Sequence, residues 1–195
     1  MEPDWLRAGV ALIAIVLGVW MVARTTVLRR AGVNVNALFS GERNLAATVL
    51  IAGAAILDLY ILLRWPFPVL DHWVRAGISP SPAAAIIVTC IASLFIAAAQ
   101  AGMGRSWRIG VPAADNDVDA LVMDGLNGVS RNPVYLGVMA FLVGLLLAAP
   151  GPLTLASLVI SFVGLTIIIE NEERYLRNRF GADYDAYARR VRRWF

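Results

Sequence analysis

Residues 130–173 read SRNPVYLGVMAFLVGLLLAAPGPLTLASLVISFVGLTIIIENEE. Two apolar runs in this stretch, roughly 134–149 and 153–169, are joined only by Pro150, Gly151 and Pro152. Because proline ends one helix and is tolerated at the start of the next, while glycine permits a turn, the stretch predicts a tight helical hairpin. The polar cluster before the first run and the glutamates after the second must then return to the same side of a bilayer.

The composition is that of a membrane protein. The chain has 195 residues, of which 59% are hydrophobic, and its mean hydropathy of +0.68 is too high for a water-soluble domain of this size. All 17 basic residues are arginine, and they lie mainly in the short segments that flank the apolar runs. Nucleic-acid binding would instead need a clustered basic face on a soluble fold, so that class of function is excluded.

Five apolar runs approach the length of about 17 to 25 residues that a helix needs to cross a bilayer. They span roughly 5–23, 45–63, 83–100, 134–149 and 153–169. The sequence therefore predicts an all-α, polytopic membrane protein with five transmembrane helices and cytoplasmic C-terminal amphipathic helices. No internal repeat or linker divides it, so residues 1–195 are expected to form one domain.

The distribution of arginine predicts the orientation. Four arginines lie in residues 24–44, two in 64–82, three in 101–133 and seven after 169. The positive-inside rule then places the N-terminus outside and the C-terminus in the cytoplasm of, we expect, a prokaryotic inner or plasma membrane. Residues 66–82 become an external loop, in which Asp71 and His72 are interpreted as a surface pair.

Metal and disulfide chemistry are not expected, because Cys90 is the only cysteine and His72 the only histidine. Asp58 lies inside the second apolar run, where an acidic residue is a functional candidate by default. Its predicted position near the external end weakens that hypothesis, since the interface is within reach.

Two polar clusters flank the hairpin, and each has two interpretations. Asn132 and Pro133 are either an ordinary helix start with Tyr135 in the aromatic belt and Gly137 as a packing contact, or a helix N-terminus that binds an anionic group. Glu170, Glu172 and Glu173 follow the second run without a break. They either pair with arginines four residues later, or bind a ribose or a cationic centre.

The C-terminal residues 170–195 predict a helix, a break at Gly181 and a second, amphipathic helix. Tyr184, Tyr187 and Val191 are spaced by three and four residues and so share one face. That face either lies on the membrane interface or folds back over the other loops.

In the polar clusters that flank the hairpin and in the C-terminal residues, the chain resembles the isoprenylcysteine carboxyl methyltransferases and the wider phospholipid-methyltransferase-like membrane enzymes. The family carries Arg-His-Pro-x-Tyr-x-Gly, then Glu-Glu, Phe-Gly-x-x-Tyr-x-x-Tyr and a basic ending. The matching residues here are Arg131, Asn132, Pro133, Tyr135, Gly137, Glu172, Glu173, Leu176, Phe180, Gly181, Tyr184, Tyr187, Val191 and Arg193. Gly104 to Trp107 resembles a Gly-x-x-Trp motif of the family. The resemblance covers roughly residues 100–195, and Asn132 stands where the family has histidine.

The resemblance implies methyl transfer from S-adenosylmethionine, which leaves as S-adenosylhomocysteine, to a lipophilic or lipid-anchored acceptor at the cytoplasmic membrane face. It implies a cofactor site formed by Arg131, Asn132, Pro133, Tyr135, Gly137, Glu172, Glu173, Tyr184 and Tyr187. Glu172 is the candidate catalytic residue. The lipid bilayer and a lipophilic or lipidated substrate are the expected partners, and the oligomeric state stays open.

Two alternatives remain from the sequence. An NADPH-dependent membrane reductase of the sterol-reductase type shares a similar C-terminal pattern. A non-enzymatic membrane scaffold would use the same acidic residues and arginines only to solvate helix ends.

Overall fold

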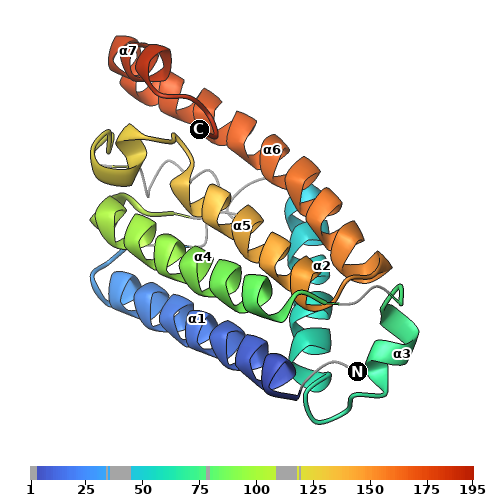
Figure 1. Ribbon diagram of the computed structural model, residues 1–195. Coiled ribbons are helices and arrows are strands. Elements are labelled where there is room, and N and C mark those ends of the chain that lie inside the picture. The colour runs from blue at the N-terminus through green and yellow to red at the C-terminus, as the bar shows by residue number, and fades with distance from the viewer. Residues whose placement is uncertain (1–3, 34, 36–44, 78–79, 109–117, 119) are drawn as a thin grey trace.

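The computed structural model describes residues 4–33, 35, 45–77, 80–108, 118 and 120–195, and in these ranges it contains helices and no strand (Figure 1). Most of the arginine-rich 24–44 and 101–133 segments lies inside the described ranges, while Arg43 lies outside them. The α-helices are α1 (Asp4–Arg30), α2 (Leu45–Leu63), α3 (Leu70–Val74), α4 (Pro82–Met103), α5 (Pro133–Ala148), α6 (Pro152–Phe180) and α7 (Ala182–Arg190). Short 3₁₀ turns, η2 (Gly104–Ser106) and η4 (Gly125–Gly128), follow α4 and precede α5.

Each of the five predicted apolar runs is a helix. In the described part of the chain, α1, α4 and α6 are long and apolar enough to cross a membrane, while α2 and α5 are shorter apolar helices. Helix α1 continues past its predicted end to Arg30, and α6 continues to Phe180. Their polar ends contain arginine and glutamate, which are good helix formers, and no glycine or proline interrupts them before Gly32 and Gly181.

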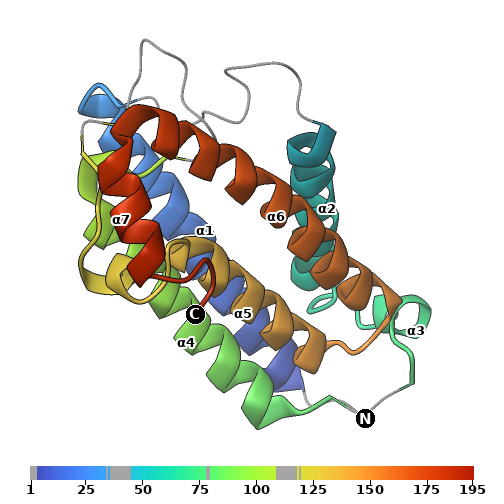
Figure 2. The same ribbon diagram turned by 90° about the horizontal axis from the view of Figure 1, so that it is seen from above.

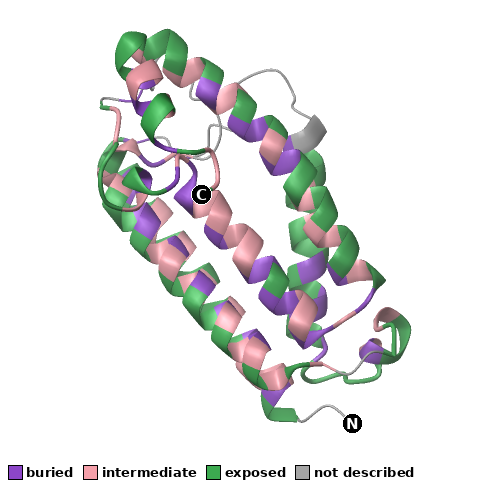
Figure 3. Ribbon diagram, turned by 45° about the horizontal axis from the view of Figure 1, so that its top comes forward, coloured by how far each residue is buried: buried purple, intermediate pink, exposed green. Residues whose placement is uncertain are grey.

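Helix α4 lies between α1 and α5, and the three form a row of neighbouring helices (Figure 1). Helix α6 leaves the α5–α6 turn at an angle to this row and packs against α2 on its other side (Figure 2). Figure 3 shows exposed residues along the helices. They include large apolar residues such as Leu12, Leu94 and Val159. Such exposed apolar residues suit contact with lipid rather than with water.

The predicted hairpin is confirmed. Helix α5 ends at Ala148, α6 begins at Pro152, and the Thr154 hydroxyl caps the turn by donating to the Ala149 carbonyl over 2.7 Å. Gly151 lies so close to the 74–75 backbone that an added Cβ would be 2.2 Å from the Val74 carbonyl oxygen. The turn is therefore fixed against the segment that follows α3.

Glycines set the close approach of the helices. A Cβ at Gly144 would lie 2.5 Å from the Thr89 side chain of α4, and one at Gly164 would lie 2.7 Å from Leu50 of α2. These two glycines therefore allow close packing between helices of the same chain.

The interpretation of Asp71 as a surface residue is wrong, because Asp71 is 7% exposed. Its carboxylate accepts hydrogen bonds from Arg64 Nε at 2.9 Å, Arg64 Nη2 at 3.0 Å, the Tyr60 hydroxyl at 2.8 Å and Arg7 Nε at 3.1 Å. Helix α3, inside the predicted external loop, turns Asp71 toward α1 and α2. The loop between α2 and α4 is thus fastened to the bundle by a buried ionic cluster.

The Asp71 cluster predicts a pH-dependent stability. Burial opposes ionisation, but hydrogen bonds from Arg64, Tyr60 and Arg7 outweigh it and lower the pKa of Asp71 to about 2. Because the native pKa is lowered, the ionised Asp71 carboxylate stabilises the fold at pH values above its unfolded pKa of about 3.9. This stabilisation is lost as the pH falls toward 2. We expect Asp71→Asn to lower the free energy of unfolding by about 3 kcal/mol at pH 7. Denaturant titrations at pH 7 and pH 3 should show the difference between the two proteins shrinking at the lower pH.

Candidate active site

The start of α5 is held by the C-terminal tail, residues 191–195. Pro133 occupies the first helical turn and Asn132 the N-cap position, but the Asn132 side chain makes no capping hydrogen bond. Its amide Nδ2 donates instead to the Arg193 carbonyl oxygen over 3.0 Å, and the Arg131 backbone N–H donates to the Arg192 carbonyl oxygen over 3.0 Å. Asparagine at this position therefore joins two segments that are far apart in the sequence.

The end of α6 brings the two glutamates to the start of α5. The apolar face of α6 continues without a break into Ile168 and Ile169, which are buried, and the next turn carries Glu172 and Glu173. The Tyr135 hydroxyl donates to Glu172 Oε1 over 2.6 Å. The expected meeting of the two polar clusters is thus a direct side-chain contact.

Glu173 is 8% exposed and is neutralised by two arginines. Arg193 donates to both of its oxygens, from Nε over 3.2 Å and from Nη2 over 2.8 Å, and Arg131 Nη2 lies 3.0 Å from Oε1. Hydrogen bonding to Glu173 raises the pKa of the Arg193 guanidinium. The pairing of Glu173 with Arg177, which is one of the two interpretations from the sequence, is not found, because Arg177 binds Asp185 over 2.9 Å.

Helix α7 covers this part of the molecule. Gly181, at φ +51°, ends α6 and reverses the chain, as its position predicts. Tyr184 and Tyr187 are 1% and 3% exposed and pack with Leu176 of α6, so the aromatic face folds back over the other loops. Burial raises the pKa of Tyr184, and it raises the pKa of Tyr187 to about 12. Both hydroxyls therefore stay protonated at neutral pH, and that of Tyr187 donates to the Asn127 carbonyl oxygen over 2.7 Å.

A cavity of about 220 Å³ lies between α5 and α6, under α7. Its polar lining comes from Arg108, Arg131, Asn132, Tyr135, Glu172, Glu173, Tyr184 and Tyr187. Its apolar lining comes from Met21, Met103, Trp107, Pro133, Val134, Val138, Leu165 and Leu176. The same cavity thus has charged residues on one part of its lining and apolar residues on the other.

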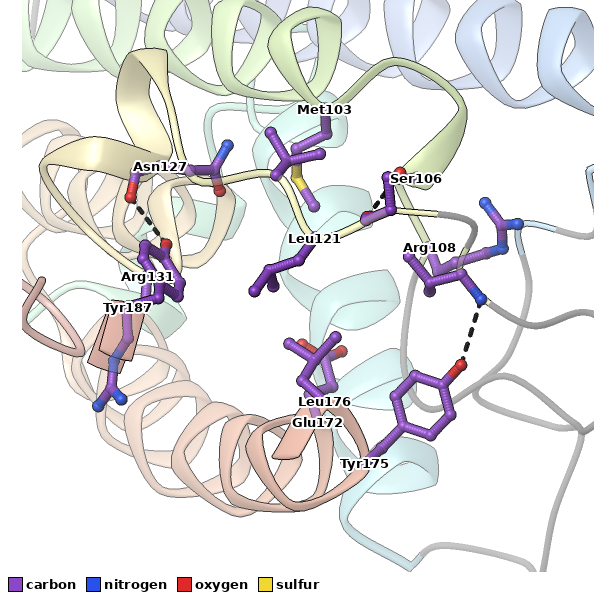
Figure 4. Close-up of a pocket in the computed structure, with 13 residues that line it drawn as sticks. Met103, Ser106, Arg108, Leu121, Asn127, Arg131, Glu172, Tyr175, Leu176 and Tyr187 are labelled. Atoms are coloured by element: carbon purple, nitrogen blue, oxygen red, sulfur yellow. Dashed lines mark hydrogen bonds between the residues drawn. The ribbon is translucent and has the colours of Figure 1, made fainter. Parts of the chain in front are cut away.

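A second pocket of about 90 Å³ shares Met103, Arg108, Arg131, Glu172, Leu176 and Tyr187 with this cavity. Figure 4 shows Met103, Leu121 and Leu176 pointing into it from different segments, with Glu172 beside Leu176. The Tyr175 hydroxyl accepts a hydrogen bond from the Val118 backbone N–H over 3.2 Å, which holds Val118 against α6. The two pockets are neighbouring lobes around Glu172.

The structure gathers eight of the nine residues predicted for the cofactor site around the larger cavity. The exception is Gly137, which is buried against α4, where an added Cβ would lie 2.6 Å from Ile96. This is the packing contact that the sequence offered as its alternative role.

The sequence did not assign Met21, Arg108 and Leu165 to the site. Arg108 directly follows the Gly-x-x-Trp motif, and this position could have indicated that it lies near the site. Met21 and Leu165 sit in ordinary apolar runs, which give no indication of what lines a cavity.

Comparison with known proteins identifies the family of this chain. Residues 80–183, which include α4, α5 and α6, match the family described as phospholipid methyltransferase. Two curated proteins, each named probable protein-S-isoprenylcysteine O-methyltransferase, from Oryza sativa subsp. indica and subsp. japonica, are 26% identical over 163 residues, which is 80% of this chain and 83% of theirs. No solved structure matches the chain. The chain belongs to the phospholipid methyltransferase family of membrane methyltransferases.

Proposed function

We propose that the protein transfers a methyl group from S-adenosylmethionine to a lipophilic or lipid-anchored acceptor at the cytoplasmic face of the membrane. The observation that carries the proposal is the single cavity in which Arg131, Glu172 and Glu173 meet the apolar Val138 and Leu165. A donor with charged ends and an acceptor with an apolar tail need such a space, because the reacting atoms must meet where water is excluded.

The residues at the ionic end fit the cofactor. Within the described residues, the Nε atom of Arg131 is a buried donor that no hydrogen bond satisfies. Together with the backbone N–H groups at the start of α5, it suits the methionine carboxylate. Glu172 lines both lobes of the site and suits the ribose hydroxyls or the cationic part of the cofactor.

S-adenosylmethionine supplies an electrophilic methyl group, so the chain has to align the acceptor and exclude water rather than create the electrophile. A carboxylate acceptor needs no base. An amine, phenol or thiol acceptor must lose a proton, and Glu172 is better placed to accept it than Glu173, whose oxygens both accept hydrogen bonds from Arg193. Tyr135 orients the Glu172 carboxylate through their 2.6 Å hydrogen bond.

The orientation follows from the arginine distribution. Five crossings by α1, α2, α4, α5 and α6 would put the N-terminus outside and the α5–α6 cavity at the arginine-rich, cytoplasmic side. The shorter α2 and α5 fit this scheme if the bilayer adapts to their length. The Asp71 cluster would then lie at the external side.

Thermal unfolding in detergent tests the cofactor assignment. A ligand that binds only the folded protein stabilises it by about 2.7 kcal/mol at a concentration one hundred times its Kd. We expect S-adenosylhomocysteine to raise the melting temperature and NADPH to leave it unchanged. A shift with NADPH alone would favour the reductase alternative, and methyl-labelled cofactor added to membranes would identify the acceptor from the labelled product.

A further inference from the structure

The tail crosses from α5 to α6 after α7 ends. On the α5 side it is held by backbone carbonyls, which accept hydrogen bonds from the Arg131 N–H and from the Ser130 and Asn132 side chains. In Figure 1 the chain end lies between the α5 and α6 ribbons. The tail therefore bridges the two helices that wall the cavity.

On the α6 side the tail makes two contacts at different positions along the helix. The Arg193 guanidinium binds Glu173 and lies 3.5 Å from Glu170. The indole of Trp194 stacks on Phe162, with ring centroids 5.9 Å apart and planes at 23°. Phe162 is 51% exposed in the apolar part of α6, so this second contact lies on the surface that faces lipid.

The two contacts differ in how easily they open. The Arg193–Glu173 contact is a two-point, charge-assisted hydrogen bond, which is strong and geometrically specific. The Trp194–Phe162 contact is one stacked ring pair, of the kind that shifts an equilibrium by roughly tenfold. The ring pair can therefore separate while Arg193 keeps the tail attached.

We propose that Trp194 is a gate residue that controls access of a lipophilic molecule from the bilayer to the α5–α6 cavity. With the ring pair closed, the tail covers the lipid-facing side of the gap between α5 and α6. With it open, an apolar chain passes toward Val138 and Leu165, which line the cavity from opposite helices. This inference builds on the proposed function, for which it supplies the acceptor route.

Labelling of a cavity cysteine with a bilayer-dissolved N-alkyl maleimide tests the gate without any methyl acceptor. The reporter is Val138→Cys in a Cys90→Ser background, reconstituted in phosphatidylcholine vesicles. We expect Trp194→Ala to speed its labelling roughly tenfold. Phe162→Ala should have the same effect. The double variant should label at the rate of either single variant, because both substitutions remove the same ring pair. Trp194→Phe keeps a ring and should label at close to the unmodified rate.

The matched control is Ile87→Cys, a lipid-facing position on α4 that is 55% exposed. Its labelling rate should be the same with and without the Trp194→Ala substitution, and the Trp194→Ala protein should keep its melting temperature. Equal labelling of Val138→Cys in the two backgrounds would overturn the gate. Failure of S-adenosylhomocysteine to stabilise the protein would refute the proposed function instead, and the labelling result does not depend on it.

Discussion

Glu173→Gln is expected to cause the largest loss of stability among single changes at the site. The substitution leaves Arg131 and Arg193 facing a neutral amide, and removal of one partner from a buried ion pair costs about 3–5 kcal/mol. We expect about 2–4 kcal/mol here, because the Arg193 side chain is 34% exposed and water partly compensates it. Denaturant unfolding in detergent measures the free energy, and S-adenosylhomocysteine should bind the variant more weakly because the Arg131 side chain loses its position.

Glu170→Gln is the matched control for this prediction. Glu170 lies one helical turn earlier on α6, is 53% exposed and approaches the same Arg193 at 3.5 Å. Its replacement should change the stability by well under about 1 kcal/mol, as is usual for exposed ion pairs. Equal effects of the two substitutions would mean that the Glu173 cluster does not organise the site.

Glu172→Gln is expected to cause the largest loss of activity with little loss of stability. The variant keeps the shape and one acceptor oxygen for Tyr135 but loses the negative charge beside both lobes of the site. If Glu172 takes a proton from the acceptor, methyl transfer should fall by about 10²-fold or more. Initial rates with methyl-labelled cofactor, compared with S-adenosylhomocysteine affinity, separate a defect in chemistry from one in binding.

Tyr135→Phe shows whether the tyrosine acts through Glu172. Phenylalanine removes only the hydroxyl, so we expect a smaller loss of rate than for Glu172→Gln. The double variant should be no slower than Glu172→Gln alone, because residues that act as one unit are not additive. Rate losses that multiply would show that Tyr135 works independently of the carboxylate.

The fold was largely predictable because its main signals are local. The Pro150–Pro152 turn and the apolar run lengths specify helices and a hairpin without reference to the rest of the chain. The proximity of Asn132 and Glu172 also followed, since a hairpin returns its two ends to one side. The sequence therefore indicated that the polar residues at these two helix ends lie close together.

Contacts between distant segments were not predictable. Asp71 looked like an external surface residue, and only the packing of α3 against α1 and α2 shows it buried with Arg64. The binding of Glu173 by Arg131 and Arg193, in place of Arg177, depends on where α7 turns the tail. Local spacing ranks only partners in the same helix, so it could not identify arginines supplied by other segments.

Photochemical cross-linking of methyl-labelled S-adenosylmethionine, followed by peptide mapping, locates the methyl-donor site on the chain. We expect label on peptides from the start of α5 and the end of α6, within residues 131–138 and 172–187. Excess S-adenosylhomocysteine should prevent that labelling. Label confined to the Asp71 side of the molecule, or label that S-adenosylhomocysteine does not displace, would contradict a methyl-donor site between α5 and α6.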